Sequence, residues 1–360
     1  MQSPRRKFYR KDKGKMFKVC LLILSIIVPV TVTVLNWSIY GVRHMKFSYP
    51  ITATFIQWVG AFILLSIING FFGPRNQSGI DLHGNIVDSK FFSRGFWKKF
   101  QLYFFPSLVY GLEIIGMNVG LFYMSISYSK ILRSIKIFFT MLLSRIFLKK
   151  QIHKYQIIAV ILSWLSFLSI FLSFVTGDIY HNFRDAPKAF IMNSIASFLG
   201  AVFLVSLAKA NTKANQELPI KMTSLQTSEL MMFWMSLVML PLSLVFEPTA
   251  ILELFDVDKK VLILLGFATV FTLINKVIVF TIVKHFTPVT VMFITQLRVI
   301  PEIIIDSIFF HKYDFQIYFV FSILFMLLSS VLYRYGSVMM TPRRETIPLL
   351  LETKDATDLF

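Results

Sequence analysis

Ten long apolar stretches run through this sequence and restrict the chain to one class of fold. A helix needs about 20 mostly apolar residues to cross a lipid bilayer, and each stretch is of that order. The stretches cover residues 19–41, 50–72, 102–125, 127–148, 155–176, 187–208, 222–246, 260–283, 287–309 and 315–338. The hydrophobic fraction is 56% and the mean hydropathy is +0.67, both above the values of a soluble domain. The sequence therefore predicts an all-α membrane protein with ten transmembrane helices.

The connections between these stretches are too short to fold as separate domains. The longest, residues 73–101, is polar and contains Gly, Asn and Asp. We therefore expect one ten-helix domain over residues 19–338, with a basic tail at residues 1–18 and a second tail at residues 339–360. The basic tail can lie against anionic lipid head groups, so membrane lipid is an expected partner.

Lys and Arg are distributed unequally between the two ends of the predicted helices. If the N-terminus lies in the cytosol, 24 of those in loops and tails lie on the cytosolic side and 7 on the opposite side. Because cytoplasmic loops of membrane proteins collect Lys and Arg, both termini are predicted to be cytosolic. The net charge of +18 then reflects membrane orientation, and no nucleic-acid partner is expected.

The order of the stretches suggests an internal repeat. The third and fourth stretches are joined by a very tight turn, and so are the eighth and ninth. A shift of 162 residues aligns Phe147–Lys150 with Phe309–Lys312 and places Lys136 on Arg298. Two inverted five-helix halves, at about residues 19–176 and 187–338, are therefore predicted. In carriers built this way, the substrate site lies near the membrane midplane between the halves.

Charged residues inside the predicted spans are the strongest functional signal. The basic ones are Lys130, Arg133, Lys136, Arg145, Lys276 and Arg298, and the acidic ones are Glu113, Glu229, Glu302 and Asp306. Each costs roughly 2.5–3.5 kcal/mol at the centre of a helix, so such residues normally face a cavity or a charged partner. Basic residues outnumber acidic ones, and an anionic substrate would neutralise the surplus.

The basic residues of the fourth stretch share one face of a helix because they are spaced by three. Lys130 lies near the end of the span and can extend to its boundary, whereas Arg133 and Lys136 lie deeper and have no acidic neighbour in their own helix. Arg133 suits phosphate best, because a guanidinium can bind two oxygens at once. An anion-binding set of Arg133, Lys136, Arg298, Lys276, Glu113 and Lys130 is therefore predicted.

Alternatives remain for the other charges. Arg298 and Glu302 are spaced by four residues and could neutralise each other in a purely structural pair. Glu113 and Glu229 could balance Lys276 or Lys136, bind a coupled proton, or accept hydrogen bonds from a sugar. Balancing of charge is the simplest of these interpretations.

The sequence contains little that suggests an enzyme or a cofactor. Its single cysteine, Cys20, excludes an intrachain disulfide and a cysteine metal site. The six histidines fall in predicted connections, without the converging arrangement that zinc requires. We expect no cofactor and no catalytic residue. Transport by this chain would then have to be driven by solute gradients.

Two segments carry a resemblance to a known family. The fourth stretch reads Ile126-Ser-Tyr-Ser-Lys-Ile-Leu-Arg133-Ser134 and later Phe147-Leu148-Lys149-Lys150, and the ninth begins Thr287-Pro288-Val289-Thr290 with Arg298 ten positions after the proline. This resembles the nucleotide-sugar and triose-phosphate translocator family of the drug/metabolite transporter superfamily, and looks closest to the GDP-fucose transporter branch. Asn36-Trp37 departs from the Asn-Lys that is common in the family.

The resemblance implies that Arg133 and Arg298 engage phosphate oxygens. It implies an endomembrane antiporter of the Golgi or endoplasmic reticulum that exchanges a nucleotide sugar for a nucleotide monophosphate. The alternatives are a carrier of a sugar phosphate or another organic solute with the same fold, and a transport-inactive regulator in the secretory pathway. The sequence is compatible with a homodimer and leaves the oligomeric state open.

The C-terminal tail contains a short sorting pattern. Glu345-Thr-Ile-Pro-Leu349-Leu350 matches an acidic dileucine motif on the predicted cytosolic side. Such a motif would be bound by a sorting adaptor and would direct the protein to a vacuole or lysosome.

Overall fold

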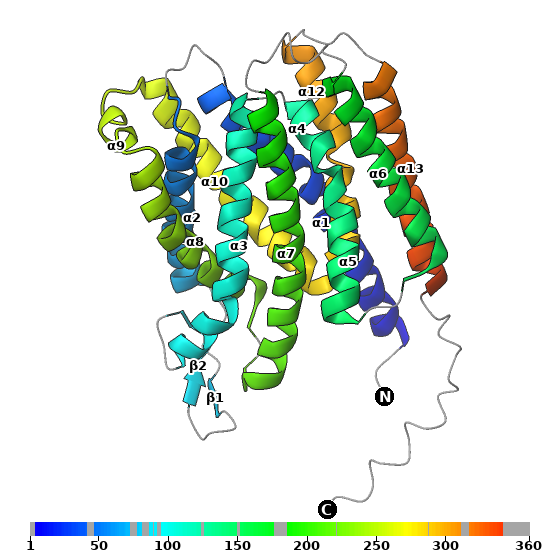
Figure 1. Ribbon diagram of the computed structural model, residues 1–360. Helices are drawn as coiled ribbons and strands as arrows, with labels where there is room; N and C mark the ends of the chain where they lie inside the picture. The colour runs from blue at the N-terminus through cyan, green and yellow to red at the C-terminus, as the bar shows by residue number, and fades with distance from the viewer. Residues whose placement is uncertain are drawn as a thin grey trace, which may run out of the picture.

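The computed structural model of the protein describes residues 4–41, 47–72, 78–80, 86–88, 90–91, 95–123, 126–149, 152–175, 186–220, 222–286, 288–310 and 317–340 (Figure 1). Within these ranges, seven helices are long and apolar enough to cross a membrane. The protein is thus a multi-span α-helical membrane protein, as the sequence predicts. That ten helices cross the membrane stays a prediction.

The long helices coincide with seven of the predicted stretches. They are α1 (Pro4–Asn36), α2 (Pro50–Phe72), α3 (Phe96–Tyr123), α6 (Lys154–Val175), α7 (Ala186–Glu217), α8 (Ser224–Phe246) and α10 (Lys259–His285). A π-helical turn, η1 (Trp37–Gly41), follows α1. Because α1 already begins at Pro4, most of the predicted basic tail continues into the first span as one helix.

The other three stretches are also helical, and two of them are interrupted. The fourth comprises α4 (Ile126–Leu132), the 3-10 turn η2 (Arg133–Ile135) and α5 (Lys136–Leu148). The ninth comprises α11 (Pro288–Gln296) and α12 (Val299–Phe310), and the tenth is α13 (Ile317–Met340). A short helix, α9 (Ala250–Glu253), and a hairpin of β1 (Ser78–Ile80) and β2 (Ile86–Asp88) lie in connections.

Helix termini are satisfied by specific side chains. Thr223 begins α8 with a capping box, in which Gln226 N donates to Thr223 Oγ1 at 3.3 Å and Thr223 N donates to Gln226 Oε1 at 2.9 Å. At the start of α2, the Glu247 carboxylate accepts from the backbone of Ile51 at 3.0 Å and of Thr52 at 2.7 Å. A carboxylate is favourable there because the first N–H groups of a helix have no partner within it.

The helices pack as a bundle in which the most extensive contacts join α6 with α13, α3 with α7, α2 with α8, and α1 with α10 (Figure 1). Small residues bring α3 and α7 together, since a Cβ on Gly116 would lie 3.1 Å from the Cβ of Ala196. Serines join α6 and α13, where Ser329 Oγ donates to the Ala159 carbonyl at 2.6 Å. Both features are typical of helix packing in membranes, where apolar burial supplies little driving force.

Each interruption has a local feature that accompanies it. In the ninth stretch, Pro301 has no N–H to donate to the carbonyl of Leu297, and the chain forms a turn at Leu297 and Arg298. In the fourth stretch, Ser163 Oγ of α6 donates to the Ser134 carbonyl at 2.8 Å and satisfies it at the 3-10 turn. The predicted stretches 127–148 and 287–309 are therefore helical, with a 3-10 turn in the first and a turn at Leu297 and Arg298 in the second.

Candidate functional site

A cavity lies within the bundle, between α1, α2, α3, α7, α10 and the two interrupted helices. It holds about 160 Å³ of space for the centres of water-sized molecules. One water needs about 10–15 Å³ by this measure, so several waters or a small solute fit. Its lining includes all six residues of the predicted anion-binding set: Arg133, Lys136, Arg298, Lys276, Glu113 and Lys130.

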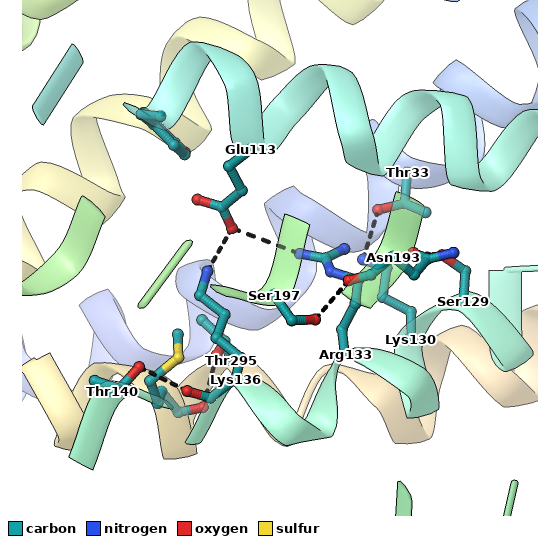
Figure 2. A network of polar contacts seen from close by, with 12 residues as sticks. Thr33, Glu113, Ser129, Lys130, Arg133, Lys136, Thr140, Asn193, Ser197 and Thr295 are labelled. Atoms are coloured by element: carbon teal, nitrogen blue, oxygen red, sulfur yellow. Dashed lines mark hydrogen bonds and ion pairs between the residues drawn. The ribbon is translucent and has the colours of Figure 1, made fainter. Parts of the chain in front are cut away.

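Glu113 lies at the centre of the first group of charges. Its Oε1 accepts a hydrogen bond from Lys136 Nζ and lies 3.9 Å from Arg133 Nη2, as the dashed lines in Figure 2 show. Gly200 of α7 makes room for this ion pair, because a Cβ at that position would collide with the Lys136 ammonium and the Glu113 carboxylate. Glu113 thus balances Lys136, one of the interpretations that the sequence left open.

A second group joins three helices. Lys130 Nζ of α4 donates to Glu302 Oε1 of α12 at 2.7 Å and to Thr33 Oγ1 of α1 at 3.2 Å. Thr33 also donates to Glu302 Oε1, at 3.3 Å. Glu302 therefore pairs with Lys130 from another helix, and the suggested pair with Arg298 is absent from the ion pairs of the described residues. The two residues are still one helical turn apart, because Glu302 N donates to the Arg298 carbonyl at 3.2 Å, but the Glu302 carboxylate points to Lys130.

The two arginines have hydrogen-bonding capacity to spare. Nε and Nη1 of Arg133 and Nε of Arg298 are buried and have no hydrogen-bond partner in the described part of the chain. Both residues lie at interruptions, Arg133 in η2 and Arg298 in the turn before α12. Unpartnered buried donors are costly, and an anion that accepts from them would remove this cost.

Lys276 is held by aromatic rings. Its Nζ donates to Tyr110 Oη at 2.7 Å and lies 4.5 Å from the ring centroid of Trp58 and 4.4 Å from that of Tyr110. Phe203 stacks on the Tyr110 ring, with 3.9 Å between the two ring centroids. Such cation–π contacts hold the ammonium without cancelling its charge. Tyr110 thus contacts both Lys276 and Phe203.

A chain of neutral polar groups completes the lining, and sequence reasoning missed most of it. Thr272 Oγ1 donates to Gln57 Oε1 at 3.2 Å, and Gln57 Nε2 donates to Asn36 Oδ1 at 2.8 Å. Amides inside apolar stretches were the available signal, because an amide in lipid needs a partner. The structure also shows Asn275 lining the cavity, with a buried Oδ1 that lacks a partner among the described residues.

Other residues singled out from the sequence lie elsewhere. Arg145 is exposed on α5, and Glu229 accepts from Asn69 Nδ2 at 2.7 Å, so Glu229 balances neither Lys276 nor Lys136. The side chain of Asp306 and the sorting motif Glu345, Leu349 and Leu350 lie outside what the structure describes.

Comparison with known proteins provides evidence for the fold alone. No family model and no curated protein matches the chain. Twenty-four chains of solved structures do match. One of them, described as "Crystal structure of protein", has a TM-score of 0.52 and 8% sequence identity over 89% of this chain and 98% of its own length. Fold and site together define a multi-span helical membrane protein with a polar, cation-rich internal cavity.

Proposed function

We propose that this protein is a carrier that moves a phosphorylated anionic metabolite across an endomembrane by alternating access. One observation carries the proposal: Arg133 and Arg298 both line the cavity, and both retain buried N–H donors without partners among the described residues. Arg133 lies in the 3-10 turn η2, and Arg298 lies in the turn between α11 and α12. Interrupted helices that line an internal cavity are the usual setting of a carrier's substrate site. Guanidinium groups are suited to phosphate because their planar donors match its oxygens.

The helix contacts support two inverted five-helix halves. In chain order the ten spans are α1, α2, α3, α4–α5, α6, α7, α8, α10, α11–α12 and α13. A shift by five spans moves α3 onto α10 and α7 onto α1. The α3–α7 pair thus corresponds to the α1–α10 pair, and both pairs are among the most extensive contacts. The pairs α2 with α8 and α6 with α13 each map onto themselves. The interrupted helices α4–α5 and α11–α12 are also equivalent under this shift. We therefore assign ten spans and a cavity between the two repeats.

The charges favour exchange over one-way transport. Among the described residues around the cavity, five cationic side chains face two carboxylates, a formal surplus of three positive charges. An empty site with this surplus resists reorientation in a low-dielectric membrane, whereas a loaded site is closer to neutral. The resemblance around Arg133 and Ser134 makes a nucleotide sugar, exchanged for a nucleotide monophosphate, the proposed cargo. The excess of Lys and Arg on one side supports cytosolic termini.

Uptake into proteoliposomes preloaded with single nucleotides tests this function. We expect one internal nucleotide to stimulate uptake of a labelled nucleotide sugar, and Arg133→Ala or Arg298→Ala to reduce that uptake at least about 100-fold, since each removes a charge-assisted contact in a desolvated site. Arg145→Ala is the matched control, because Arg145 lies on the same interrupted helix as Arg133 but is exposed.

The outcomes separate the candidate functions. Undiminished uptake in the Arg133 and Arg298 variants would reject the assigned site. Uptake of a sugar phosphate without any response to nucleotides would favour the second kind of carrier, and a protein that moves no solute but alters glycosylation when deleted would favour a regulator.

A further inference from the structure

A cavity whose proposed task is to bind anions has one carboxylate in its lining, Glu113, and a second, Glu302, paired with the lining residue Lys130. The side chain of Glu113 is 2% exposed and that of Glu302 is fully buried. Each uses one oxygen for a lysine, Lys136 for Glu113 and Lys130 for Glu302. The Oε2 of each is buried and has no partner within the described ranges.

These carboxylates divide the five cations into two kinds. Lys130 and Lys136 each form a close ion pair, whose field largely cancels at a distance. Arg133 has only the long 3.9 Å contact with Glu113, and no described carboxylate forms an ion pair with Arg298 or Lys276. An anion in the cavity therefore experiences mainly the charge of Arg133, Arg298 and Lys276. Because charges in a desolvated site interact strongly, the size of this net charge matters for affinity.

We propose that Glu113 and Glu302 set the number of negative charges that the cavity accepts. By neutralising two of the five cations, they tune the site to anions that carry two or three negative charges. Loss of either carboxylate raises the surplus by one and shifts the preference toward a more highly charged anion. This inference rests on the proposed function, because it assigns charge selectivity to the same site.

Glutamine variants test the inference with little change of shape. Glu113→Gln and Glu302→Gln keep an oxygen that can accept from the paired lysine. The purified full-length variants are titrated with inorganic phosphate, pyrophosphate and triphosphate at constant ionic strength, and affinity is read from thermal stabilisation. We expect each variant to shift the ratio of triphosphate to pyrophosphate affinity about tenfold toward triphosphate, as one added charge within several ångströms would do.

The control is a buried carboxylate outside the cavity. Glu229 of α8 accepts a hydrogen bond from Asn69 and is absent from the cavity lining. Unlike Glu302, it forms no described ion pair with a lysine of that lining, so Glu229→Gln should leave the ratio as in the wild type. Charge-balanced pairs give a second check. Glu113→Gln combined with Lys136→Gln, and Glu302→Gln combined with Lys130→Gln, restore the original surplus and should return the ratio to that of the wild type.

Two results would overturn charge selection by these residues. One is a ratio within twofold of the wild type in both single variants, and the other is an equal shift in Glu229→Gln. Failure of the proposed function looks different: the wild type would then bind none of the three anions, or Arg133→Ala and Arg298→Ala would bind them unchanged.

Discussion

Lys130 Nζ and Glu302 Oε1 lie 2.7 Å apart although 172 positions separate the two residues in the sequence. Their contact joins the first interrupted helix to the second, and Thr33 of α1 hydrogen-bonds to both. Because Glu302 is fully buried, this ion pair is both a structural link across the bundle and part of the electrostatics of the cavity.

The same ion pair predicts an asymmetric effect of mutation. Among the described residues, Glu302→Ala leaves the Lys130 ammonium with the Thr33 hydroxyl alone as a hydrogen-bond partner. We expect the free energy of unfolding to fall by about 3 kcal/mol. The double variant Lys130→Met with Glu302→Leu removes both charges and should recover most of that loss. Thermal unfolding of the purified variants measures this. A double variant less stable than Glu302→Ala would contradict it.

Gly200 is predicted to be required for the Lys136–Glu113 ion pair. The side chain of Gly200→Ala would overlap both charged groups, so one of them must move away from α7. We expect a loss of stability of about 1–3 kcal/mol and weaker anion binding. Gly266→Ala on α10 is the matched control, because a Cβ there meets nothing within 4 Å. Unfolding temperature and phosphate titration provide the two measurements, and equal behaviour of both variants would argue against a steric role for Gly200.

Tyr110 is predicted to position Lys276. Tyr110→Phe keeps the ring and its stacking on Phe203 but removes the oxygen that accepts from Lys276 at 2.7 Å. We expect weaker anion binding by about tenfold, because the ammonium loses one fixed partner in a site of low dielectric constant. Tyr335→Phe, at an exposed position of α13, serves as the control. Wild-type affinity in Tyr110→Phe would show that the rings alone hold Lys276.

Pro301 is predicted to serve transport more than stability. Pro301→Ala restores the N–H that can donate to the Leu297 carbonyl and allows α11 and α12 to join at Arg298. We expect equal or higher thermal stability together with at least about tenfold slower exchange, because Arg298 would turn with the helix away from its present position. Pro241→Ala, at an exposed site within α8, tests the general effect of removing a proline. Unchanged exchange in Pro301→Ala would refute a role for the break.

Much of the helical framework could be predicted from the sequence. Helices occupy all ten predicted stretches within the described ranges. The reason is that the length and hydrophobicity of a segment are local properties, and in lipid such a segment must satisfy its backbone hydrogen bonds within itself. The cost of burying charge also singled out residues that the structure brings together, since Arg133 and Arg298 line one cavity. That they bind an anion stays a prediction. The inverted repeat stays a prediction that the helix contacts support.

The sequence by itself determined that the chain enters a membrane as helices and that several charged side chains within the spans need a cavity or a charged partner. Only the tertiary structure decided which partners they find. Glu302 contacts Lys130 instead of Arg298, Gly200 accommodates an ion pair from two other helices, and Gln57 links Thr272 to Asn36. The physical reason is that hydrophobicity acts along one segment, whereas an ion pair or an amide hydrogen bond depends on which helices meet, and that is settled by packing of the whole bundle.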